Sequence, residues 1–380
     1  MRFKEFRFDE ITLNFDKQRI PLSSMQRSQK QGTYRYYGAQ GVIDYVDDYL
    51  FDGRYLLIAE DGENLKSKKQ NIAQIVSGKF WVNNHAHIVQ TNENCNLFYL
   101  CYLLNHLDIS GYITGSAQPK LSQGNMNAIR LLLPERTYQD KVVALLKSFD
   151  DKIQLNNEIN NNLEQQMQSY YQHLFLDDAD PAWSTGSISN LGEVVGGSTP
   201  SKKNPEYYTE KGIAWITPKD LSNDKSKFIS HGEIDITELG LKNSSARIMP
   251  RGTILFSSRA PIGYIAVADA EVTTNQGFKS IIPKAEIGSE FVYFFLKNNL
   301  SMIEGMASGS TFKEISGSTM KKIPATIPGK NALNRFRAFC EPIFTEQRTL
   351  EAENKILTET RDNLLPKLMS GELNVSDTDL

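Results

Sequence analysis

The sequence lacks the features that mark secreted, membrane-embedded and disordered proteins. Among 380 residues it has 3 cysteines and no CxxC pair, which argues against a disulfide framework and against a structural zinc site. Its longest apolar runs, such as residues 98–104, are far shorter than the roughly 20 residues that span a bilayer. The N-terminal residues show no signal-peptide core, and no low-complexity block stands out. We therefore expect a cytoplasmic globular protein that does not contact a membrane.

Motifs for catalysis are also missing. No G-x-x-x-x-G-K-[ST] phosphate loop occurs, so the chain is not an ATP-driven motor. Asn204-Pro205-Glu206-Tyr207 differs from the Asn-Pro-Pro-Tyr loop of adenine methyltransferases, and no glycine-rich cofactor loop accompanies it. Glu353-Asn354-Lys355 imitates one end of a nuclease site but lies on a predicted helix. His85 and His87 have no further ligands at metal spacing. These absences favour a non-catalytic chain without a metal or cofactor, and a stand-alone methyltransferase or nuclease is the enzyme alternative.

Excess charge of either sign is small. The 42 basic and 45 acidic residues give a net charge of −3. Along the chain the balance is +2 in residues 1–136, −5 in 137–181, +3 in 182–330 and −3 in 331–380. A polyanion that contacts the first and third blocks is compatible with this pattern, although imbalances of this size also arise by chance.

An internal repeat is present. The segment Gly115–Ser122 precedes the similar segment Gly309–Ser316 by 194 positions, and residues 98–105 resemble 291–298 at a shift of 193. The shift of 194 also aligns three further pairs without a gap, namely Met126 with Met320, Ile129 with Ile323 and Pro134 with Pro328. The chain therefore reads as two copies of one unit.

Each copy ends in a helical stretch with a heptad pattern, which predicts two helices that pair along an apolar seam. Asn160 and Asn354 occupy the same seam position in the two copies, where an asparagine fixes the register at a cost in stability. Pro366 is expected to end or kink the second helix near its last turn. The predicted seam residues are Leu146, Phe149, Ile153, Asn160, Leu163, Ile343, Leu350, Asn354, Leu357 and Leu364.

The blocks before the helices predict strand-rich α+β domains. Short apolar, β-prone segments such as 55–59, 80–82 and 253–256 are bounded by turn residues, and each block has one helix, near 96–107 or 289–300. The expected order is a first domain, a central long helix, a second domain, a C-terminal long helix and an acidic tail, at residues 1–136, 137–178, 179–329, 330–370 and 371–380.

The repeat predicts a geometry. If the two long helices pair with each other, they are antiparallel, and a pseudo-two-fold axis places the two globular domains at opposite ends. Two heads on a rigid bar suit the reading of two patches on an extended ligand at a fixed distance. Duplex DNA is such a ligand, since half-sites one turn apart lie roughly 34–36 Å from centre to centre.

At this point the sequence resembles a known family, the specificity (S) subunits of type I restriction–modification systems. The resemblance covers essentially the whole chain, and the order of its duplicated pieces is more specific than any one piece. In the first half it rests on residues 37–44, 49–53, 59–62 and 80–87. In the second half it rests on residues 196–201, 213–221, 250–255, 257–263 and 273–278.

The resemblance implies two target-recognition domains, each reading one half of a bipartite DNA sequence. It also implies that the helix pair sets the unread spacer and docks two methyltransferase subunits, which modify adenine with S-adenosylmethionine. Nuclease subunits that translocate DNA with ATP and Mg would join the complex, and the S subunit itself is not catalytic. The alternative is a coiled-coil scaffold whose heads bind protein, which the near-neutral charge of the heads favours.

Candidate DNA contacts are basic residues for phosphates and amides or hydroxyls for base edges. The repeated Gly-Ser loop should present different side chains in the two heads, such as Gln118 against Phe312. Gly196-Gly197-Ser198-Thr199 is either a phosphate cradle or a plain turn. The candidates are Lys66, Lys68, Lys69, Ser116, Gln118 and Lys120 in the first head, and Lys202, Lys203, Arg259, Asn275, Gln276, Ser310, Thr311 and Lys313 in the second.

Overall fold

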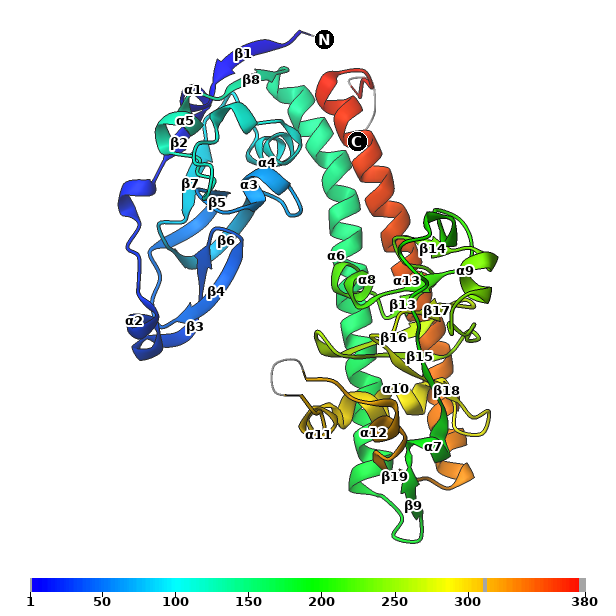
Figure 1. The fold of residues 1–380 in the computed structure, drawn as a ribbon. Coiled ribbons are helices and arrows are strands. Elements are labelled where there is room, and N and C mark those ends of the chain that lie inside the picture. Colours follow the sequence, from blue (N-terminus) through cyan, green and yellow to red (C-terminus); the bar gives the residue numbers. More distant parts are fainter. Residues whose placement is uncertain (1, 310–312, 376–380) are drawn as a thin grey trace. The chain divides into compact units, whose positions relative to one another are not determined.

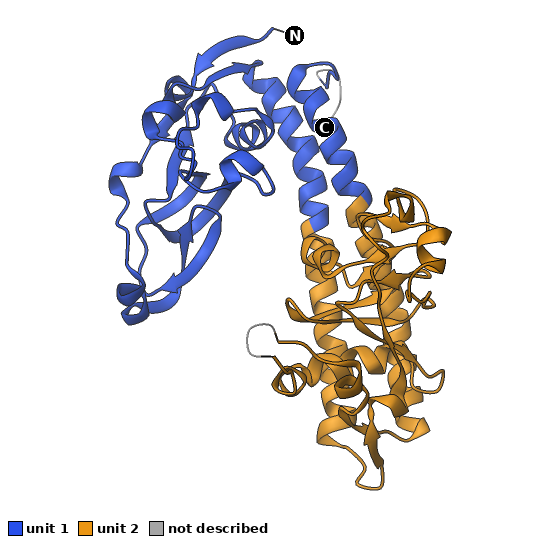
Figure 2. Cartoon of the chain, in the orientation of Figure 1, with its two compact units in different colours: residues 1–153, 356–380 blue, residues 154–355 orange. Residues whose placement is uncertain are grey.

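The computed structural model describes residues 2–309 and 313–375. The chain forms two compact units, unit 1 of residues 1–153 and 356–380 and unit 2 of residues 154–355 (Figure 2). The boundaries fall within two long helices, so each unit combines a stretch of both helices with a strand-rich part. We call the strand-rich part of unit 1 head 1 (residues 2–135) and that of unit 2 head 2 (residues 178–329).

Head 1 is built on a six-stranded sheet with the order β2-β7-β5-β6-β3-β4. The central strand β5 carries the apolar run at 55–59, and Leu56, Leu57 and Ile58 are buried. A separate antiparallel pair joins β1 to β8. The strands are β1 (Lys4–Arg7), β2 (Thr12–Asn14), β3 (Gln31–Gly38), β4 (Gly41–Val46), β5 (Phe51–Ala59), β6 (Ala73–Val82), β7 (Ala86–Thr91) and β8 (Arg130–Leu133).

The main helix of head 1 is α4, which packs on the sheet near the predicted range of 96–107. Asn96 caps it by accepting hydrogen bonds from the backbone N–H groups of Phe98 and Tyr99. The remaining helices are single turns. The helical segments are α1 (Phe8–Ile11), η1 (Asp16–Gln18), α2 (Ser24–Gln29), α3 (Asn64–Ser67), α4 (Leu97–His106), η2 (Ser110–Tyr112) and α5 (Gln123–Asn127).

Head 2 is built on a five-stranded sheet with the order β10-β18-β15-β16-β13. Three two-stranded ladders, β9-β19, β11-β14 and β12-β17, accompany it. The strands are β9 (Ser184–Ser187), β10 (Gly192–Gly196), β11 (Tyr208–Thr209), β12 (Trp215–Ile216), β13 (Phe228–Ile229), β14 (Asp235–Ile236), β15 (Ile254–Ser258), β16 (Ile262–Ala268), β17 (Thr273–Thr274), β18 (Lys279–Pro283) and β19 (Pro324–Ile327).

The helices of head 2 repeat those of head 1 around the Gly-Ser loop. Ser122 before α5 and Ser316 before α12 are both N-caps that accept from the backbone N–H three residues on. The helical segments are α7 (Ile188–Leu191), η4 (Pro205–Tyr207), α8 (Pro218–Asn223), α9 (Glu238–Lys242), α10 (Ser289–Asn298), α11 (Leu300–Gly305) and α12 (Gly317–Lys321).

The two sheets share one topology. The order β2-β7-β5-β6-β3 of head 1 corresponds strand for strand to β10-β18-β15-β16-β13 of head 2. In both, the pair at the fourth and fifth positions is parallel, β3 with β6 and β13 with β16, whereas the other neighbours are antiparallel. The predicted α+β class with an internal repeat is therefore confirmed.

The two long helices are α6 (Arg136–Gln172), continued by a π-helical turn at His173–Asp177, and α13 (Lys330–Ser370) (Figure 1). In unit 1, Asp150 of α6 lies 2.6 Å from Arg361 of α13. In unit 2, the rings of Tyr170 and Phe339 are 4.7 Å apart between centroids. As the residue number increases along α6, the number of its contact partner on α13 decreases, so the helices are antiparallel, as predicted.

Of the two outcomes expected at Pro366, an end or a kink of the second helix, the first is wrong. Pro366 does not end α13, which continues to Ser370 and also contains Pro342. A proline removes one backbone donor from a helix interior. Burial of Leu368 and Met369 against the core of unit 1 keeps the last turn helical.

Candidate nucleic-acid interface

The Gly-Ser loop of head 1 closes on itself through a pair of backbone hydrogen bonds. Thr114 and Lys120 exchange N–H···O bonds of 2.9 and 2.7 Å. Gly115 has a φ of +84°, and a Cβ at this position would lie 2.2 Å from the carbonyl oxygen of Gln118, so glycine is required there. The loop tip, including the predicted contacts Ser116 and Gln118, is exposed.

This loop is fastened to the end of the central strand β5. The backbone N–H of Leu121 donates to the carbonyl of Glu60 at 2.8 Å. The backbone of Lys120 also forms an isolated antiparallel β-bridge with that of Asp61. The Lys120 ammonium also lies 3.2 Å from the Glu60 carboxylate. The predicted contact Lys120 is thus held beside an acidic strand end.

Head 2 repeats the arrangement on β15. Ser308 and Glu314 exchange backbone bonds of 3.1 and 2.9 Å, Glu314 bridges to Arg259, and the N–H of Ile315 donates to the carbonyl of Ser258 at 3.0 Å. The predicted contacts Ser310 and Thr311 lie outside the described residues. Arg259 and Lys313 both line one cavity, so the structure brings these two predicted contacts together.

The basic side chains at residues 66–69 of head 1 contact the Gly-Ser loop at one point. The Lys66 ammonium donates to the carbonyl of Gly115 at 3.1 Å, which joins two predicted segments. Lys68 instead donates to the carbonyl of Leu107, and Lys69 is exposed beside it.

The remaining predicted contacts of head 2 surround a tight turn. The N–H of Ser198 donates to the carbonyl of Thr274 at 2.8 Å, and a Cβ on Gly197 would lie 1.9 Å from the carbonyl oxygen of Asn275. Gln276 bonds to the Thr199 hydroxyl. Because the N–H of Ser198 is already bonded, and that of Gly197 points at the carbonyl of Phe278, this is a plain turn rather than a phosphate cradle.

Lys202 and Lys203 are exposed in the loop that follows the turn. They are more than fifty positions from Arg259 and Lys313 in the sequence, and they do not line the cavity that those two residues share. The side chain of Asn275 accepts from the N–H of Gly277 at 2.8 Å, which gives it a role in the turn itself.

A buried polar group supports the loop of head 1 from behind. His87 is 1% exposed, with its Nδ1 2.6 Å from Asp16 and its Nε2 2.8 Å from the carbonyl oxygen of Leu121. Burial alone would raise the pKa of Asp16, but the hydrogen bond from His87 and its charge hold that pKa below its ordinary value. His87 is therefore a hydrogen-bonded core residue that positions the start of the segment after the loop, and His85 pairs with Asp61 at 2.7 Å.

Each of the predicted seam residues is buried or half-buried. Asn354 and Asn160 do not face each other. Asn156, which is fully buried, donates to Asn354 at 2.9 Å and to Glu353 at 2.8 Å. In an antiparallel pair, equivalent residues meet different partners, and the repeat partner of Asn156 is Leu350.

Head 2 is tied to both long helices by a buried ionic group. The Lys227 ammonium lies 2.8 Å from Glu164 of α6, 2.9 Å from Gln347 of α13 and 3.8 Å from the ring centroid of Phe344. Burial lowers the pKa of Lys227, against the attraction of Glu164. Burial would likewise raise the pKa of Glu164, but the ammonium groups of Lys227 and Lys297 hold it below its ordinary value.

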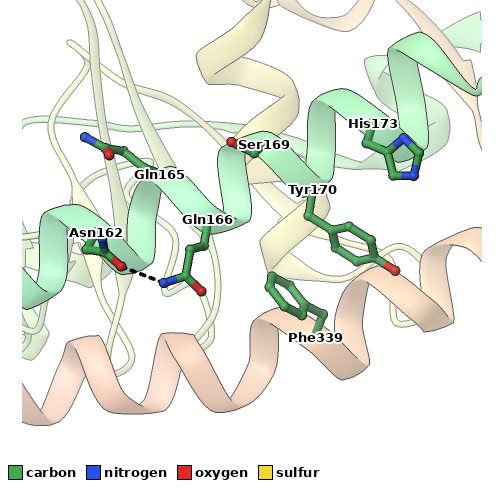
Figure 3. Close-up of a pocket in the computed structure, with 7 residues that line it drawn as sticks. All are labelled: Asn162, Gln165, Gln166, Ser169, Tyr170, His173 and Phe339. Atoms are coloured by element: carbon green, nitrogen blue, oxygen red, sulfur yellow. Dashed lines mark hydrogen bonds between the residues drawn. The ribbon is translucent and has the colours of Figure 1, made fainter.

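A shallow surface hollow of about 500 Å³ lies on the helix pair in unit 2 (Figure 3). The rings of Tyr170 and Phe339 form its apolar end, and Phe339 is 37% exposed. Three amide side chains line the rest together with Ser169 and His173, and Gln166 donates to Asn162 at 2.6 Å. None of its lining side chains is a lysine or an arginine.

Sequence reasoning did not assign Glu60, Glu314 or Lys279 to the interface. The shift of 194 aligns Lys120 with Glu314, so the repeat alone could have identified Glu314 as a candidate. The strand ends are harder to match, because Glu60 and Asp61 correspond to Ser258 and Arg259 at a shift of 198 and share no side-chain type. Only the backbone bridges reveal that correspondence.

Comparison with known proteins places this geometry in a family. Residues 2–165 and 182–352 match the type I restriction modification DNA specificity domain. The chain is 49% identical over 148 residues to the type I restriction enzyme MjaIX specificity subunit of Methanocaldococcus jannaschii, a match that covers 38% of this chain and 34% of that subunit. It is 26% identical over 417 residues to the HindI specificity subunit of Haemophilus influenzae, covering 88% of this chain and 87% of that subunit.

A solved structure shares the fold. The S subunit of a type I restriction–modification system from M. genitalium superimposes with a TM-score of 0.63 at 12% sequence identity, and the match covers 97% of this chain and 96% of that one. The chain belongs to the family of type I restriction–modification specificity domains, with two copies of the domain in one polypeptide. Within the described residues, no helix combines the length and apolar character needed to cross a membrane.

Proposed function

We propose that the chain is a non-catalytic subunit that gives a type I restriction–modification complex its DNA sequence specificity. The observation that carries the proposal is the duplicated head. Each head presents a Gly-Ser loop fastened to the end of the central strand of the same sheet topology. A reader of a bipartite target needs such equivalent surfaces carrying different side chains, and Gln118 has Phe312 as its counterpart.

The helix pair supports a role in setting the spacer and docking partners. Phe339 corresponds to Leu145 and Tyr170 corresponds to Leu364 at the shift of 194, so each pair takes one residue from each helix. The aromatic pair lines the hollow in unit 2, and both leucines are half-buried against the core of unit 1. Apolar residues at equivalent positions of the two units suit two copies of one partner, which we propose are two methyltransferase subunits.

The partners would supply the chemistry. Methyltransferase subunits would use S-adenosylmethionine, and nuclease subunits that join them would use ATP and Mg, in the cytoplasm. This chain would hold duplex DNA and no cofactor of its own.

A salt titration tests the proposal. The full chain, alone and with its co-expressed methyltransferase, is titrated with a mixed-sequence duplex of about three helical turns. We expect weak binding alone, tighter binding with the partner, and a decrease of log K with log salt of roughly 0.9 per phosphate contact. Binding that does not depend on salt, or no DNA binding even with the partner present, would contradict the proposal and favour a scaffold whose heads bind protein.

A further inference from the structure

The loop and the strand end carry opposite charges in the two heads. Lys120 and Glu314 occupy the same position of the repeat and make the same backbone bridges. In head 1 the cation is on the loop and faces Glu60 of the strand. In head 2 the anion is on the loop and faces the Arg259 side chain at 3.6 Å. The backbone geometry is thus kept while the sign of the charge is reversed.

Head 2 adds a second cation to this contact. The ammonium of Lys279, at the start of the neighbouring strand β18, lies 3.4 Å from the other carboxylate oxygen of Glu314. It is also 3.4 Å from the Ser258 hydroxyl and from the carbonyl oxygen of Gln276. The Glu314 carboxylate therefore sits between a guanidinium and an ammonium, with one oxygen toward each.

This contact is open to solvent and loosely held. The side chains of Arg259 and Glu314 are 37% and 39% exposed, and the one of Lys279 is 15% exposed. The Arg259 guanidinium has five N–H donors, so one carboxylate oxygen at 3.6 Å leaves donors for another acceptor. The three donors of the Lys279 ammonium face three acceptors, so a phosphate oxygen can bind it only in place of the Glu314 oxygen. Arg259, Lys313 and Glu314 also line a surface cavity of about 640 Å³ together with Glu304, and this cavity gives an anion access to the Arg259 side of the contact.

We propose that Arg259 and Lys279 form a binding site for one phosphodiester of DNA, and that Glu314 occupies this site until DNA displaces its side chain. The inference rests on the proposed function, since it assumes that head 2 contacts DNA. A phosphate satisfies the same two cations that the carboxylate satisfies, and arginine pairs with either anion through two parallel N–H bonds. Only the Glu314 side chain has to move, because the backbone bridge to Arg259 does not involve it.

The arrangement makes the two heads respond differently to DNA. In head 1, Lys120 is 53% exposed on the loop, where it can meet a phosphate directly, and its acid lies beneath it on the strand. In head 2 the acid lies on the loop above the cations. Head 2 therefore contributes less to affinity until Glu314 is displaced, and the loop carboxylate works against non-specific binding.

The test compares isosteric variants of the full chain on a fluorescent mixed-sequence duplex of about three helical turns. Glu314→Gln should tighten binding by roughly fivefold, the equivalent of an exposed ion pair. Lys120→Gln, at the same repeat position, should weaken binding.

The matched control is Glu271→Gln. Glu271 is exposed and comes after the C-terminal end of β16, whereas Arg259 comes before its N-terminal end. The substitution therefore removes the same charge from the same head, but far from the proposed site. Its effect should be less than about twofold, because exposed charges are screened within a Debye length. A further background, Arg259→Gln with Lys279→Gln, removes the site, and Glu314→Gln should then add no more than the control.

Three outcomes decide the matter. A gain for Glu314→Gln that exceeds the control and disappears without the two cations supports the site. A gain equal to that of Glu271→Gln, or one that persists without the two cations, would overturn the site while leaving the proposed function intact. If the unmodified chain shows no salt-dependent DNA binding, either alone or with its methyltransferase, both the site and the proposed function are overturned.

Discussion

Asn156 and Asn160 lie one turn apart on α6, and we predict that replacing them by leucine changes the stability of unit 2 in opposite directions. Asn160 has a side-chain oxygen that is buried and finds no hydrogen-bond partner within the described residues. The antiparallel register in which Asn156 meets Asn354 aligns Asn160 with Leu350. Gln347 does bond to Asn160, but to its backbone carbonyl, at 3.1 Å. Replacement of the side chain therefore leaves that bond in place.

Asn160→Leu should stabilise unit 2. Removing an unpartnered buried acceptor is worth about 1 kcal/mol, and half-burying a leucine in its place adds about 1 kcal/mol. Asn156→Leu also removes an unpartnered buried side-chain oxygen and gains similar apolar contact, together about 2 kcal/mol. It loses, however, the hydrogen bonds to Asn354 and to the charged Glu353, about 1 and about 2 kcal/mol respectively. The first variant should be more stable than the unmodified chain by about 1–2 kcal/mol, and the second should be less stable by about 1 kcal/mol.

Thermal unfolding followed by far-UV circular dichroism measures both variants. For a unit of this size, Tm moves by about 2–4 °C per kcal/mol. Asn161→Leu, at an exposed position of the same helix, corrects for the higher helix propensity of leucine. If Asn156→Leu proves as stable as Asn160→Leu, the hydrogen bonds of Asn156 contribute nothing to stability, and the difference we infer between the two asparagines is refuted.

Two further predictions concern unit 2. Phe336→Ala should destabilise it by about 3–5 kcal/mol, because the side chain is 1% exposed and its ring centroid lies 5.2 Å from that of Phe175. The same substitution at Phe339, which is 37% exposed, should lower Tm much less. The pKa of Glu164 lies below its ordinary value of 4.5, so its contribution to stability is present above pH 4.5 and is lost as the pH falls through the lowered pKa. Glu164→Gln should therefore make unfolding less sensitive to acid, and equal acid sensitivity in the two proteins would count against the buried pair with Lys227.

The fold followed from the sequence where a pattern extends over many residues. The heptad seam predicted both long helices and their pairing, because an apolar stripe sustained over several turns has few other solutions. The order of domain and helix in the repeat predicted that the paired helices are antiparallel. The helices α4 and α10 and the central strands β5 and β15 lie where short apolar runs predicted them. Pro366 shows the limit of local rules. Burial of the residues after it outweighed one lost hydrogen bond.

The interface followed only in part. The Gly-Ser loops were visible because their glycines and caps recur at a constant shift. The residues beneath them were not, because Asp61 and Arg259 are equivalent through backbone pairing alone. Lys227 could not be foreseen either, since its partners Glu164 and Gln347 come from two helices distant in the sequence.

The reversed charge of the two loops indicates what the duplication preserved. A backbone bridge between loop and strand end needs no particular side chain, so it survived while Lys120 and Glu314 diverged. An ion pair beside the backbone bridge is nevertheless present in both heads. Glu60 pairs with Lys120 in head 1, and Arg259 and Lys279 pair with Glu314 in head 2. Exposed ion pairs add little stability, so stability alone is a weak reason to keep them. A surface that meets a polyanion gives a stronger one, because whichever member of the pair lies outermost decides how the approaching phosphates are received.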